Sequence, residues 1–187
     1  MSEISLKETH PISFRALNLK SDAVFLLEWV THPHAKYWGM LDATIEDLTA
    51  AYTQLLNIPN YKVYVGEING EATFLMESYD PKTDFIGKKY EVQEGDYGMH
   101  VLVKPPNKSI RGFTWHIFSS IMNFLFEDKK CRRIVVEPDI HNSKIHRLNK
   151  RAGFVYEKEV ALPNKVAFLA FCTLESYQKS QTKLIEI

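Results

Sequence analysis

The spacing of apolar positions predicts a chain in which strands alternate with helices. Residues 12–16 alternate apolar and polar side chains, which is typical of a half-buried strand. The helix expected after residue 18 has one apolar face, formed by Val24, Leu27 and Val30. A second helix is expected from Thr44, whose hydroxyl can cap the helix while Asp47 reaches back. Its apolar face comprises Leu48, Tyr52, Leu55 and Leu56.

The middle of the chain predicts an antiparallel hairpin. Residues 61–68 and 72–79 both have the composition of strands, and Asn69-Gly70 between them is the strongest short hairpin signal in the sequence. A polar stretch rich in turn formers covers residues 80–95. Another strand is expected at 97–103, where two prolines follow its end.

The segment that follows predicts one strand–helix–strand crossover. Arg111-Gly112 opens a helix, and a short strand at 133–136 comes after it. The helix has an apolar stripe that comprises Ile117, Phe118, Ile121, Met122 and Leu125.

The C-terminal segment predicts a short basic helix and a second hairpin. Asn142 can cap the helix, and Gly153 suits the left-handed residue after its end. Strands are expected at 154–162 and 166–174. Residues after Tyr177 are expected to form a solvated tail.

This order of elements predicts an α/β (α+β) fold with a mixed, mostly antiparallel sheet flanked by helices. The chain has 187 residues, of which 45% are hydrophobic, and this is enough for one sizeable core. No repeat, low-complexity tract or linker divides the sequence. We therefore expect a single domain over 1–187, with its core at 12–177 and flexible termini.

Composition and charge exclude several classes of protein. The 23 basic and 23 acidic side chains cancel, so the chain has no bulk attraction for nucleic acid or an acidic membrane. Cys131 and Cys172 have no partner at ligand spacing, which argues against a disulfide scaffold or a zinc site. The sequence shows no signal peptide and no uncharged apolar stretch of about 18 residues. These features favour a cytoplasmic protein.

The basic helix carries a spaced motif. Within NSKIHRLNKRAGF, residues fall at offsets 0, 3, 6, 11 and 12: Asn142, Ile145, Leu148, Gly153 and Phe154. This spacing resembles the N-x-x-A-x-x-L-Y-x-x-x-G-F signature of the GNAT superfamily of acyl-CoA N-acyltransferases. The resemblance implies a GNAT-like fold, in which a parallel strand pair splays apart and the acyl-CoA arm lies in the gap. From the offsets alone, a capped amphipathic helix ended by glycine explains the residues as well.

The segment around Arg111-Gly112 resembles the pyrophosphate loop of the same superfamily. Free amides at a helix N-terminus stabilise phosphate oxygens, and glycine lets the backbone come close. The usual second small residue would stand at Thr114, and the loop at 106–110 is longer than normal, so a glycine that merely starts a helix is the alternative. The resemblance assigns acyl-CoA binding to Val101, Val103, Arg111, Gly112, Phe113, Thr114 and Asn142.

Longer strings extend the resemblance to one group of acyltransferases. The strings are GDYGMHVLVKPP, the stretch from RGFTWHIF to NKVAFLAF, WVTHPHAKYWGM and FLMESYDP, and together they cover nearly everything from Ile12 to Tyr177. They resemble the N-acyltransferases of hydroxamate siderophore biosynthesis, of the aerobactin, alcaligin, rhizobactin and desferrioxamine type. The resemblance implies transfer of an acetyl or succinyl group from acetyl-CoA or succinyl-CoA to the hydroxylamine nitrogen of an N-hydroxylated lysine or diamine. It implies no metal, and other siderophore-assembly enzymes as partners.

Acyl transfer to nitrogen needs a proton acceptor, because the nitrogen sheds a proton as it attacks the thioester. His100 is the best candidate, since it lies mid-strand between Met99 and Val101 and imidazole accepts protons near neutral pH. Asp139 can orient the imidazole, and the resemblance assigns this work to a histidine and an acid at these places. Asn149 stands where many superfamily members have a proton-donating tyrosine. The alternatives are a core histidine and a turn aspartate that accepts backbone hydrogen bonds.

Candidate substrate ligands are Trp38, Glu77, Tyr79 and Lys165. A tryptophan in a polar loop and an acid that interrupts an apolar strand suggest a pocket for a cationic or polar substrate. Lys165 can meet a substrate carboxylate or a CoA phosphate. Ordinary packing at a rim, or contact with water alone, is the alternative for each of them.

Two other functions stay open from the sequence. One is a general GNAT acetyltransferase that acts on an unrelated amine, and the other is a non-catalytic module that binds acyl-CoA. Turnover with both hydroxylated and plain amines favours the first, and binding without turnover favours the second.

Overall fold

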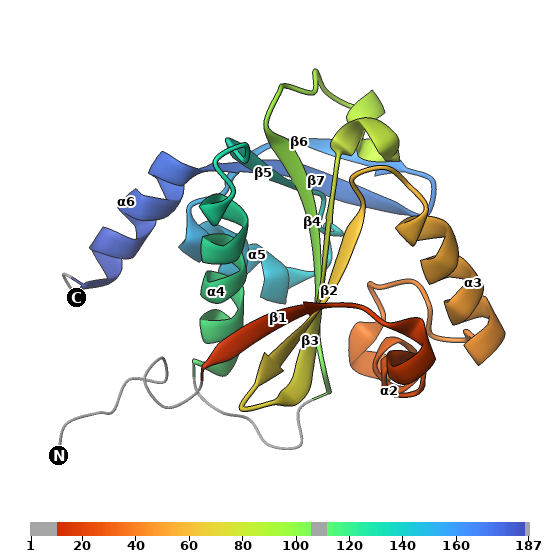
Figure 1. The fold of residues 1–187 in the computed structure, drawn as a ribbon. Coiled ribbons are helices and arrows are strands. Elements are labelled where there is room, and N and C mark those ends of the chain that lie inside the picture. The colour runs from red at the N-terminus through yellow and green to blue at the C-terminus, as the bar shows by residue number, and fades with distance from the viewer. Residues whose placement is uncertain (1–10, 106–111, 186–187) are drawn as a thin grey trace, which may run out of the picture. The chain divides into compact units, whose positions relative to one another are not determined.

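The structure is a computed structural model that describes residues 11–105 and 112–185, with side chains described up to residue 182. The chain divides into two compact units. The first comprises residues 1–78 and 100–120, and the second comprises residues 79–99 and 121–187. Figure 1 shows the elements of both units along the chain.

Antiparallel strands form the sheet of the first unit. β1 (Ile12–Ala16) pairs with β2 (Lys62–Ile68), and β2 pairs with β3 (Glu71–Tyr79). The turn between β2 and β3 is Asn69-Gly70, whose φ angles of 53° and 78° are the positive values that a two-residue hairpin turn requires. The C-terminal half of β4 (Asp96–Val103) follows β3 in strand order. The predicted hairpin is confirmed (Figure 1).

The first helix, α2 (Leu19–Thr31), is capped by Asn18, whose side chain accepts a hydrogen bond from Lys20 N. Its buried residues are Asp22, Ala23, Leu26, Trp29 and Val30. The predicted apolar face is wrong in part, because Val24 is 72% exposed. The buried residues recur every three or four positions, so the buried stripe runs beside Val24 and includes an acidic residue.

The second helix, α3 (Ile45–Leu56), begins with the predicted capping box. Thr44 Oγ1 accepts from Asp47 N at 3.2 Å, and Asp47 Oδ2 accepts from Thr44 N at 2.9 Å. The buried residues of this helix are Leu48 and Tyr52. The short helix η1 (Pro33–Ala35) lies between α2 and α3 in the chain.

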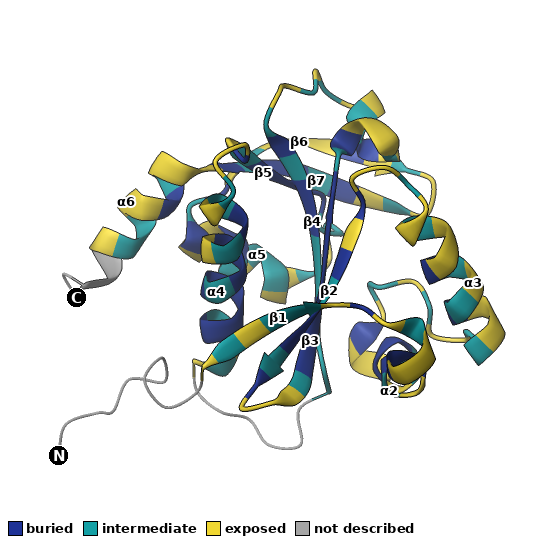
Figure 2. Ribbon diagram, in the orientation of Figure 1, coloured by how far each residue is buried: buried dark blue, intermediate teal, exposed yellow. Residues whose placement is uncertain are grey.

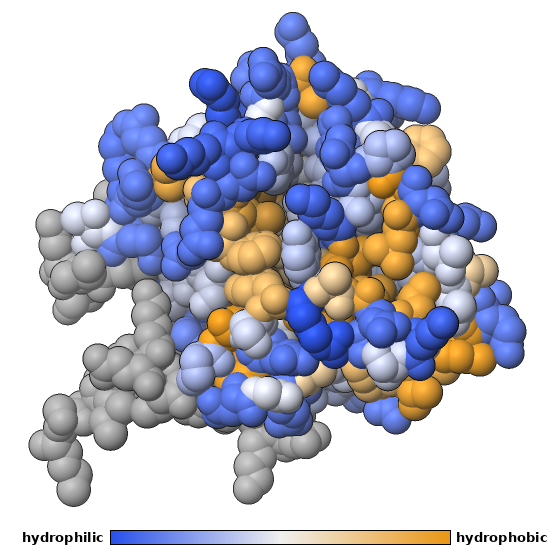
Figure 3. Space-filling model, viewed as in Figure 1, coloured by the Kyte–Doolittle hydropathy of each residue, from blue (hydrophilic) through white to orange (hydrophobic). Residues whose placement is uncertain are grey.

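Exposed apolar side chains of the first unit include Val24, Leu41 and Leu56, of which Leu56 is 40% exposed in the last turn of α3. Figure 3 shows apolar surface in the region of α2 and α3. Leu56 was predicted to face the core, and its place at the helix end explains the difference. Single exposed apolar residues are ordinary on protein surfaces.

The second unit holds the parallel strand pair. The N-terminal half of β4 pairs in parallel with β5 (Arg133–Val136), and β5 pairs antiparallel with β7 (Lys165–Thr173), which pairs with β6 (Val155–Leu162). The strand order is β1-β2-β3-β4-β5-β7-β6. The parallel register ends where Gly98 faces Val135, although β4 runs on. A mixed, mostly antiparallel sheet with one parallel pair confirms the predicted fold class.

Two short helices order the polar segment between β3 and β4: η2 (Pro81–Thr83) and η3 (Phe85–Lys88). At the start of β4, Asp96 accepts hydrogen bonds from Arg133 Nε at 2.7 Å and Arg133 Nη2 at 2.8 Å. It also accepts one from the Tyr90 hydroxyl at 3.0 Å. A fork of two charge-assisted hydrogen bonds therefore ties β4 to β5 at the buried Asp96.

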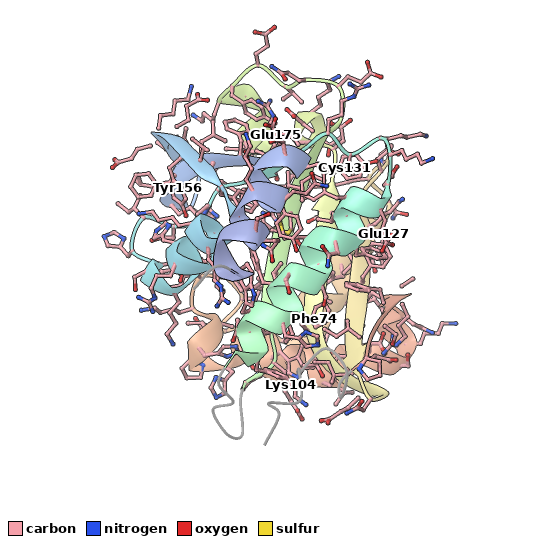
Figure 4. The ribbon with its side chains drawn as sticks, turned by 90° about the vertical axis from the view of Figure 1, so that its left-hand side faces the viewer. Phe74, Lys104, Glu127, Cys131, Tyr156 and Glu175 are labelled. Carbon is pink, nitrogen blue, oxygen red and sulfur yellow. The ribbon has the colours of Figure 1, made fainter. Side chains whose placement is uncertain are left out.

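The helix between β4 and β5, α4 (Phe113–Glu127), carries the predicted apolar stripe. The five residues of the stripe are at most 4% exposed: Ile117, Phe118, Ile121, Met122 and Leu125. Figure 2 shows the buried residues of this helix in dark blue. Figure 4 shows Glu127 at its C-terminal end and Cys131 beyond it, ahead of β5.

The basic helix of the second unit is α5 (Ser143–Ala152). Asn142 caps it by accepting a hydrogen bond from Ile145 N at 3.4 Å, and Gly153 follows with a φ of 92°. A Cβ at Gly153 would lie 2.5 Å from the carbonyl oxygen of Ser176. Both the backbone conformation and the available space therefore require glycine here, as predicted.

A final helix, α6 (Leu174–Ile185), stands where a solvated tail was predicted after Tyr177. Residues 178–182 are exposed or half-buried, as predicted, but they form part of a helix that was not predicted. Tyr177 is 4% exposed, its hydroxyl donates to Asn123 Oδ1 at 2.9 Å, and its ring stacks on Phe126 at 5.9 Å between centroids. Among the side chains of α6 described up to residue 182, Tyr177 is the buried one, and a helix with so few buried positions offers no long apolar stripe in the sequence.

Among the described residues, none of the helices is long and apolar enough to span a bilayer. The same part of the chain contains no group of three or more His, Cys, Asp or Glu side chains that could hold a metal ion. Cys131 and Cys172 are free and buried. Burial raises the pKa of each thiol to about 12, so both stay protonated at neutral pH.

A buried carboxylate ties β1 to the start of α2. The Arg15 guanidinium donates to the two oxygens of Asp22 at 2.6 and 3.1 Å and to Glu67 Oε1 at 2.6 Å. Asp22 Oδ2 also accepts from Asn18 N at 2.9 Å. Burial by itself would raise the pKa of Asp22, but the hydrogen bonds from Arg15 and Asn18 hold it below its ordinary range.

We expect Asp22→Asn to lower the free energy of unfolding at neutral pH by about 2 kcal/mol, the scale of hydrogen bonds to a charged group. The pKa of Asp22 is lower in the folded chain, so its contribution is complete above the ordinary carboxyl pKa of about 3.9. It is lost as the pH falls through the lowered value. Urea unfolding across acid and neutral pH should show a shallower acid loss for the variant, and equal losses would contradict this role.

Candidate active site

His100 on β4 and Glu77 on β3 form a close contact in the first unit. Nδ1 of His100 lies 2.9 Å from Oε2 of Glu77. The side chain of His100 is 29% exposed, whereas that of Glu77 is 6% exposed. The structure thus brings together a residue predicted to be the base and one predicted to bind substrate. It leaves the histidine the more accessible of the two.

Two tyrosines complete the surroundings of Glu77, and neither was predicted as a site residue. The Tyr52 hydroxyl donates to Oε1 at 3.0 Å, and the Tyr61 hydroxyl donates to Oε2 at 2.7 Å. Burial, and then the charge of Glu77, raise the pKa of Tyr52 well above its ordinary value, so its hydroxyl keeps its proton. The sequence placed Tyr52 on the apolar face of its helix, and only its contact with Glu77 reveals a polar role.

Trp38 joins the same group from the segment between η1 and α3. Its Nε1 donates to the Tyr52 hydroxyl at 3.3 Å, and its ring makes an edge contact with the ring of His100 at 6.3 Å between centroids. Three predicted site residues, Trp38, Glu77 and His100, therefore belong to one connected group.

The other two predicted substrate ligands, Tyr79 and Lys165, meet at Glu137 in the second unit. The Tyr79 hydroxyl donates to Glu137 Oε2 at 3.3 Å, and Lys165 Nζ lies 3.5 Å from Oε1. Glu137 is 5% exposed, so these groups pair a buried charge. A Cβ at Gly98 would lie 2.3 Å from the Tyr79 ring, so glycine makes room for it. Glu137 was not predicted, although it comes two residues before Asp139.

Asp139 shapes the turn that leads into α5. Its Oδ1 accepts a hydrogen bond from His141 N at 2.8 Å and lies 3.1 Å from His141 Nδ1. Its carbonyl oxygen accepts from Asn142 N at 3.0 Å. The turn role that was the alternative for Asp139 is therefore present. The predicted pairing of Asp139 with His100 joins residues of different units, and it stays a prediction.

Asn149 holds the position that the resemblance assigns to a proton-donating tyrosine. It is fully buried on α5, and its Nδ2 donates to the hydroxyl of Tyr156 on β6 at 3.2 Å. That hydroxyl also lies 2.8 Å from Nδ1 of His146. Figure 4 shows Tyr156 among the side chains of the second unit. Asn149 thus links α5 to β6.

The start of α4 has backbone features that suit a phosphate group. Gly112 has a φ of 80°, and the first turn of the helix is closed by a hydrogen bond from His116 N to Gly112 O at 2.9 Å. The amides of Phe113 and Thr114 precede that bond, at the positive end of the helix dipole. The other residues predicted to bind acyl-CoA are Val101 and Val103 on β4, Asn142 at the start of α5, and Arg111, which lies outside the described residues.

These groups suit acyl transfer, since an imidazole can accept a proton and a helix N-terminus can hold a phosphate. The sequence profile of a family described as an acetyltransferase (GNAT) domain matches residues 18–162. The chain belongs to this GNAT family. It is an acyl-CoA-dependent N-acyltransferase, which confirms the predicted enzyme class.

Several curated proteins similar to this GNAT chain are named as acyltransferases that act on lysine or on hydroxylated amines. An N-hydroxyputrescine acetyltransferase of Acinetobacter baumannii is 22% identical over 88% of this chain and 79% of the relative. The lysine N-acyltransferase MbtK of Mycobacterium tuberculosis is 29% identical over 76% of this chain and 68% of the relative. An N(6)-hydroxylysine O-acetyltransferase of Escherichia coli is 24% identical over 82% of this chain and 49% of the relative. The predicted resemblance is confirmed.

Solved structures share the fold of this GNAT chain. An uncharacterized protein from Bacillus halodurans matches with a TM-score of 0.86 and 30% identity, over 92% of this chain and 89% of that one. The aminoglycoside acetyltransferase AAC(6')-Ib, solved with paromomycin and acetyl-CoA, matches with a TM-score of 0.79 and 22% identity, over 90% and 96%. The predicted GNAT-like fold is thus confirmed.

We expect Gly112→Ala to raise the KM for acyl-CoA about tenfold, which corresponds to about 1.4 kcal/mol of binding. An alanine at a φ of 80° displaces the backbone whose amides would face the pyrophosphate. The KM for the amine should change little. Steady-state rates of CoA thiol release measure both values.

Gly70→Ala is the matched control for this substitution. Gly70 has a φ of 78° and lies in the β2–β3 turn, where a Cβ meets nothing within 4 Å. Both variants therefore carry a similar backbone strain. A KM for acyl-CoA that rises equally in the two variants would contradict a phosphate site at the start of α4.

Proposed function

We propose that this enzyme transfers an acetyl or succinyl group from acyl-CoA to the hydroxylamine nitrogen of an N-hydroxylated lysine or diamine, in the assembly of a hydroxamate siderophore. The observation that carries the proposal is the imidazole of His100, held 2.9 Å from the buried Glu77. It occurs in a chain similar to an N-hydroxyputrescine acetyltransferase over 88% of its length. A histidine held in this way suits the proton transfer that this acceptor requires.

The reaction forms a C–N bond and breaks the C–S bond of the thioester, while the nitrogen loses a proton and the CoA sulfur gains one. The hydroxylamine nitrogen attacks the thioester carbonyl, the C–N bond forms, and collapse of the tetrahedral intermediate breaks the C–S bond. His100 accepts the proton that the nitrogen sheds. CoA leaves as a thiolate, which is a tolerable leaving group because thiols ionise near pH 8.5, and it then takes up a proton. Asp139 is the proposed acid partner that stabilises the imidazolium.

The side chains proposed to bind the acceptor are divided between the two units. Trp38 and Glu77 belong to the first unit, together with the proposed base His100. In the second unit, Tyr79 and Lys165 both meet the carboxylate of Glu137. Lys165 is already 3.5 Å from a carboxylate, so a substrate carboxylate would have to compete with Glu137 for it. This favours a diamine acceptor over an amino acid.

N-acetylation of another class of amine is the second candidate. The observation that favours it is the similarity to an aminoglycoside N(6')-acetyltransferase of Klebsiella pneumoniae, which is 23% identical over 89% of this chain. A non-catalytic module that binds acyl-CoA is the remaining alternative from the sequence. Membership of an acetyltransferase family favours turnover over binding alone.

We expect an N-hydroxydiamine to be acylated with a kcat/KM about 10²–10³ times that of its parent diamine at pH 7.4. A lysine-type amine has a pKa of about 10.4, so only about one molecule in 10³ carries a free lone pair at that pH. A hydroxylamine is far less basic and arrives unprotonated. The measurement compares N-hydroxyputrescine, N-hydroxycadaverine and N6-hydroxylysine with their parent amines, using acetyl-CoA and succinyl-CoA in turn.

Identifying the product and measuring the rates with competing substrates will distinguish the siderophore acyltransferase from an acetyltransferase of other amines. A hydroxamate gives a coloured complex with ferric iron, whereas an ester formed at the hydroxylamine oxygen does not. Kanamycin and paromomycin are the controls for the second candidate. Equal kcat/KM values for the hydroxylated and plain diamines, or faster turnover of an aminoglycoside, would refute the siderophore assignment.

We expect His100→Ala to lower kcat by about 10²–10⁴, the usual contribution of a general base. The affinity for acyl-CoA should be kept, because the substitution removes the imidazole without adding bulk. Asp139→Asn should lower kcat less. The double variant should be little worse than His100→Ala alone, since residues that act as one unit give non-additive losses.

The pH dependence of the same variants provides the check. The log of kcat/KM for the wild-type enzyme should rise with pH to a plateau, and His100→Ala should abolish the rise. If the losses of the two single variants multiply, Asp139 acts independently of His100. If the rise survives in His100→Ala, the base is another group.

A further inference from the structure

The Glu77 carboxylate is surrounded by two tyrosine hydroxyls and an imidazole nitrogen. Oε1 accepts from Tyr52, Oε2 accepts from Tyr61, and the same Oε2 lies 2.9 Å from Nδ1 of His100. The residue is 4% exposed, so these partners take the place of water. Both tyrosine hydroxyls donate to it. An ionised carboxylate only accepts hydrogen bonds, so a hydrogen bond with His100 at this distance requires a proton at Nδ1.

We propose that Glu77 is the positioning residue of the acyl transfer: it holds the Nδ1 proton of His100, so that Nε2 is the atom that takes the proton from the acceptor nitrogen. The inference rests on the proposed role of His100 as the general base. It moves Glu77 from the substrate-binding role expected from the sequence to a place behind the imidazole.

The contact between Glu77 and Nδ1 determines which nitrogen of the His100 ring can accept a proton. A neutral imidazole carries one N–H and one lone pair, so a proton held at Nδ1 leaves the lone pair on Nε2. When Nε2 accepts a proton, the positive charge forms beside the carboxylate of Glu77. The carboxylate therefore selects the reactive tautomer and also stabilises the ion that forms during attack. A role for Asp139 then concerns the imidazolium and not the tautomer.

The network behind Glu77 keeps the carboxylate from rotating away. Tyr52 reaches it from α3 and Tyr61 reaches it from the residue before β2. Trp38 donates to the Tyr52 hydroxyl at 3.3 Å and also contacts the His100 ring by its edge. Because every oxygen of Glu77 already has a tyrosine donor, the carboxylate has little capacity left for a substrate ammonium.

Nitrogen NMR of the free enzyme tests the tautomer directly, without any substrate. Histidine labelled with ¹⁵N gives different ring patterns for a proton at Nδ1 and a proton at Nε2, and comparison with His100→Ala assigns the signal. We expect the neutral form of His100 to carry its proton at Nδ1. Neutral histidine in water prefers Nε2–H, so finding that form at His100 would overturn the proposal.

The pH profile of Glu77→Gln tests the electrostatic part. A carboxylate favours the protonated imidazole, so its removal should let the imidazole lose its proton at lower pH. We expect the midpoint of log kcat/KM to move down by about one pH unit or more. The value at the plateau should fall about 10- to 100-fold, which is less than for His100→Ala because the imidazole remains.

The same change elsewhere on β3 is the matched control. Glu71 lies on that strand with a side chain that is 75% exposed, and it contacts Lys104. Glu71→Gln should leave the midpoint and the His100 signal unchanged. Glu77→Asp keeps the charge and should restore the midpoint at least in part, although it withdraws the carboxylate by one methylene. Tyr61→Phe should weaken the effect of Glu77 and shift the midpoint by less than Glu77→Gln.

A purely structural Glu77 predicts different results. In that case Glu77→Gln lowers the unfolding temperature and kcat, but the midpoint stays where it is and His100 keeps its tautomer. That outcome would overturn the proposal. The NMR experiment needs no acceptor, so a failure of the hydroxylamine assignment and a failure of the Glu77 assignment are separate results.

Discussion

A carboxylate that is removed from water must find hydrogen-bond donors inside the protein, and Glu77 requires several elements to supply them. Tyr52 comes from α3, Tyr61 precedes β2, and His100 lies on β4. Displacing any of these elements would leave a buried charge short of a partner, which costs several kcal/mol. The position of α3 in the first unit and the orientation of the His100 ring therefore depend on one side chain. The segment before α3 is linked to the same side chain through Trp38, which donates a hydrogen bond to the Tyr52 hydroxyl.

The second unit applies the same rule to two other acids. Asp96 is held by the fork of Arg133, and Glu137 is held by Tyr79 and Lys165. Asp96 is the first residue of β4, and Glu137 comes directly after the last residue of β5, so both acids lie at ends of the two parallel strands. Hydrogen bonds and ion pairs at these places fix the start of β4 and the end of β5. The groups proposed for substrate binding are for this reason also groups on which the fold depends.

Membership of the GNAT family establishes the class of reaction, whereas the acceptor depends on particular side chains. The names of two relatives refer to different acceptors, N-hydroxyputrescine in one and an aminoglycoside in the other. Direct transfer requires a correctly positioned proton acceptor and the binding of both substrates at once. It does not require a covalent intermediate between the acyl group and the enzyme. We propose that His100 and the buried carboxylate of Glu77 meet the first requirement. The amides at the start of α4 suit one part of the second.

Local signals in the sequence predicted local structure correctly. The Asn69-Gly70 turn, the Thr44 capping box and Gly153 depend on residues within four positions of each other, and sequence spacing reports such contacts. The helix α6 was not predicted, because its described side chains form no apolar stripe and the buried one among them is Tyr177. The sequence by itself determined the order of most elements, the family resemblance and His100 as candidate base. Only the tertiary structure decided which side chains surround Glu77, because its partners lie 16 to 25 residues away along the chain and no local pattern records a contact at that separation.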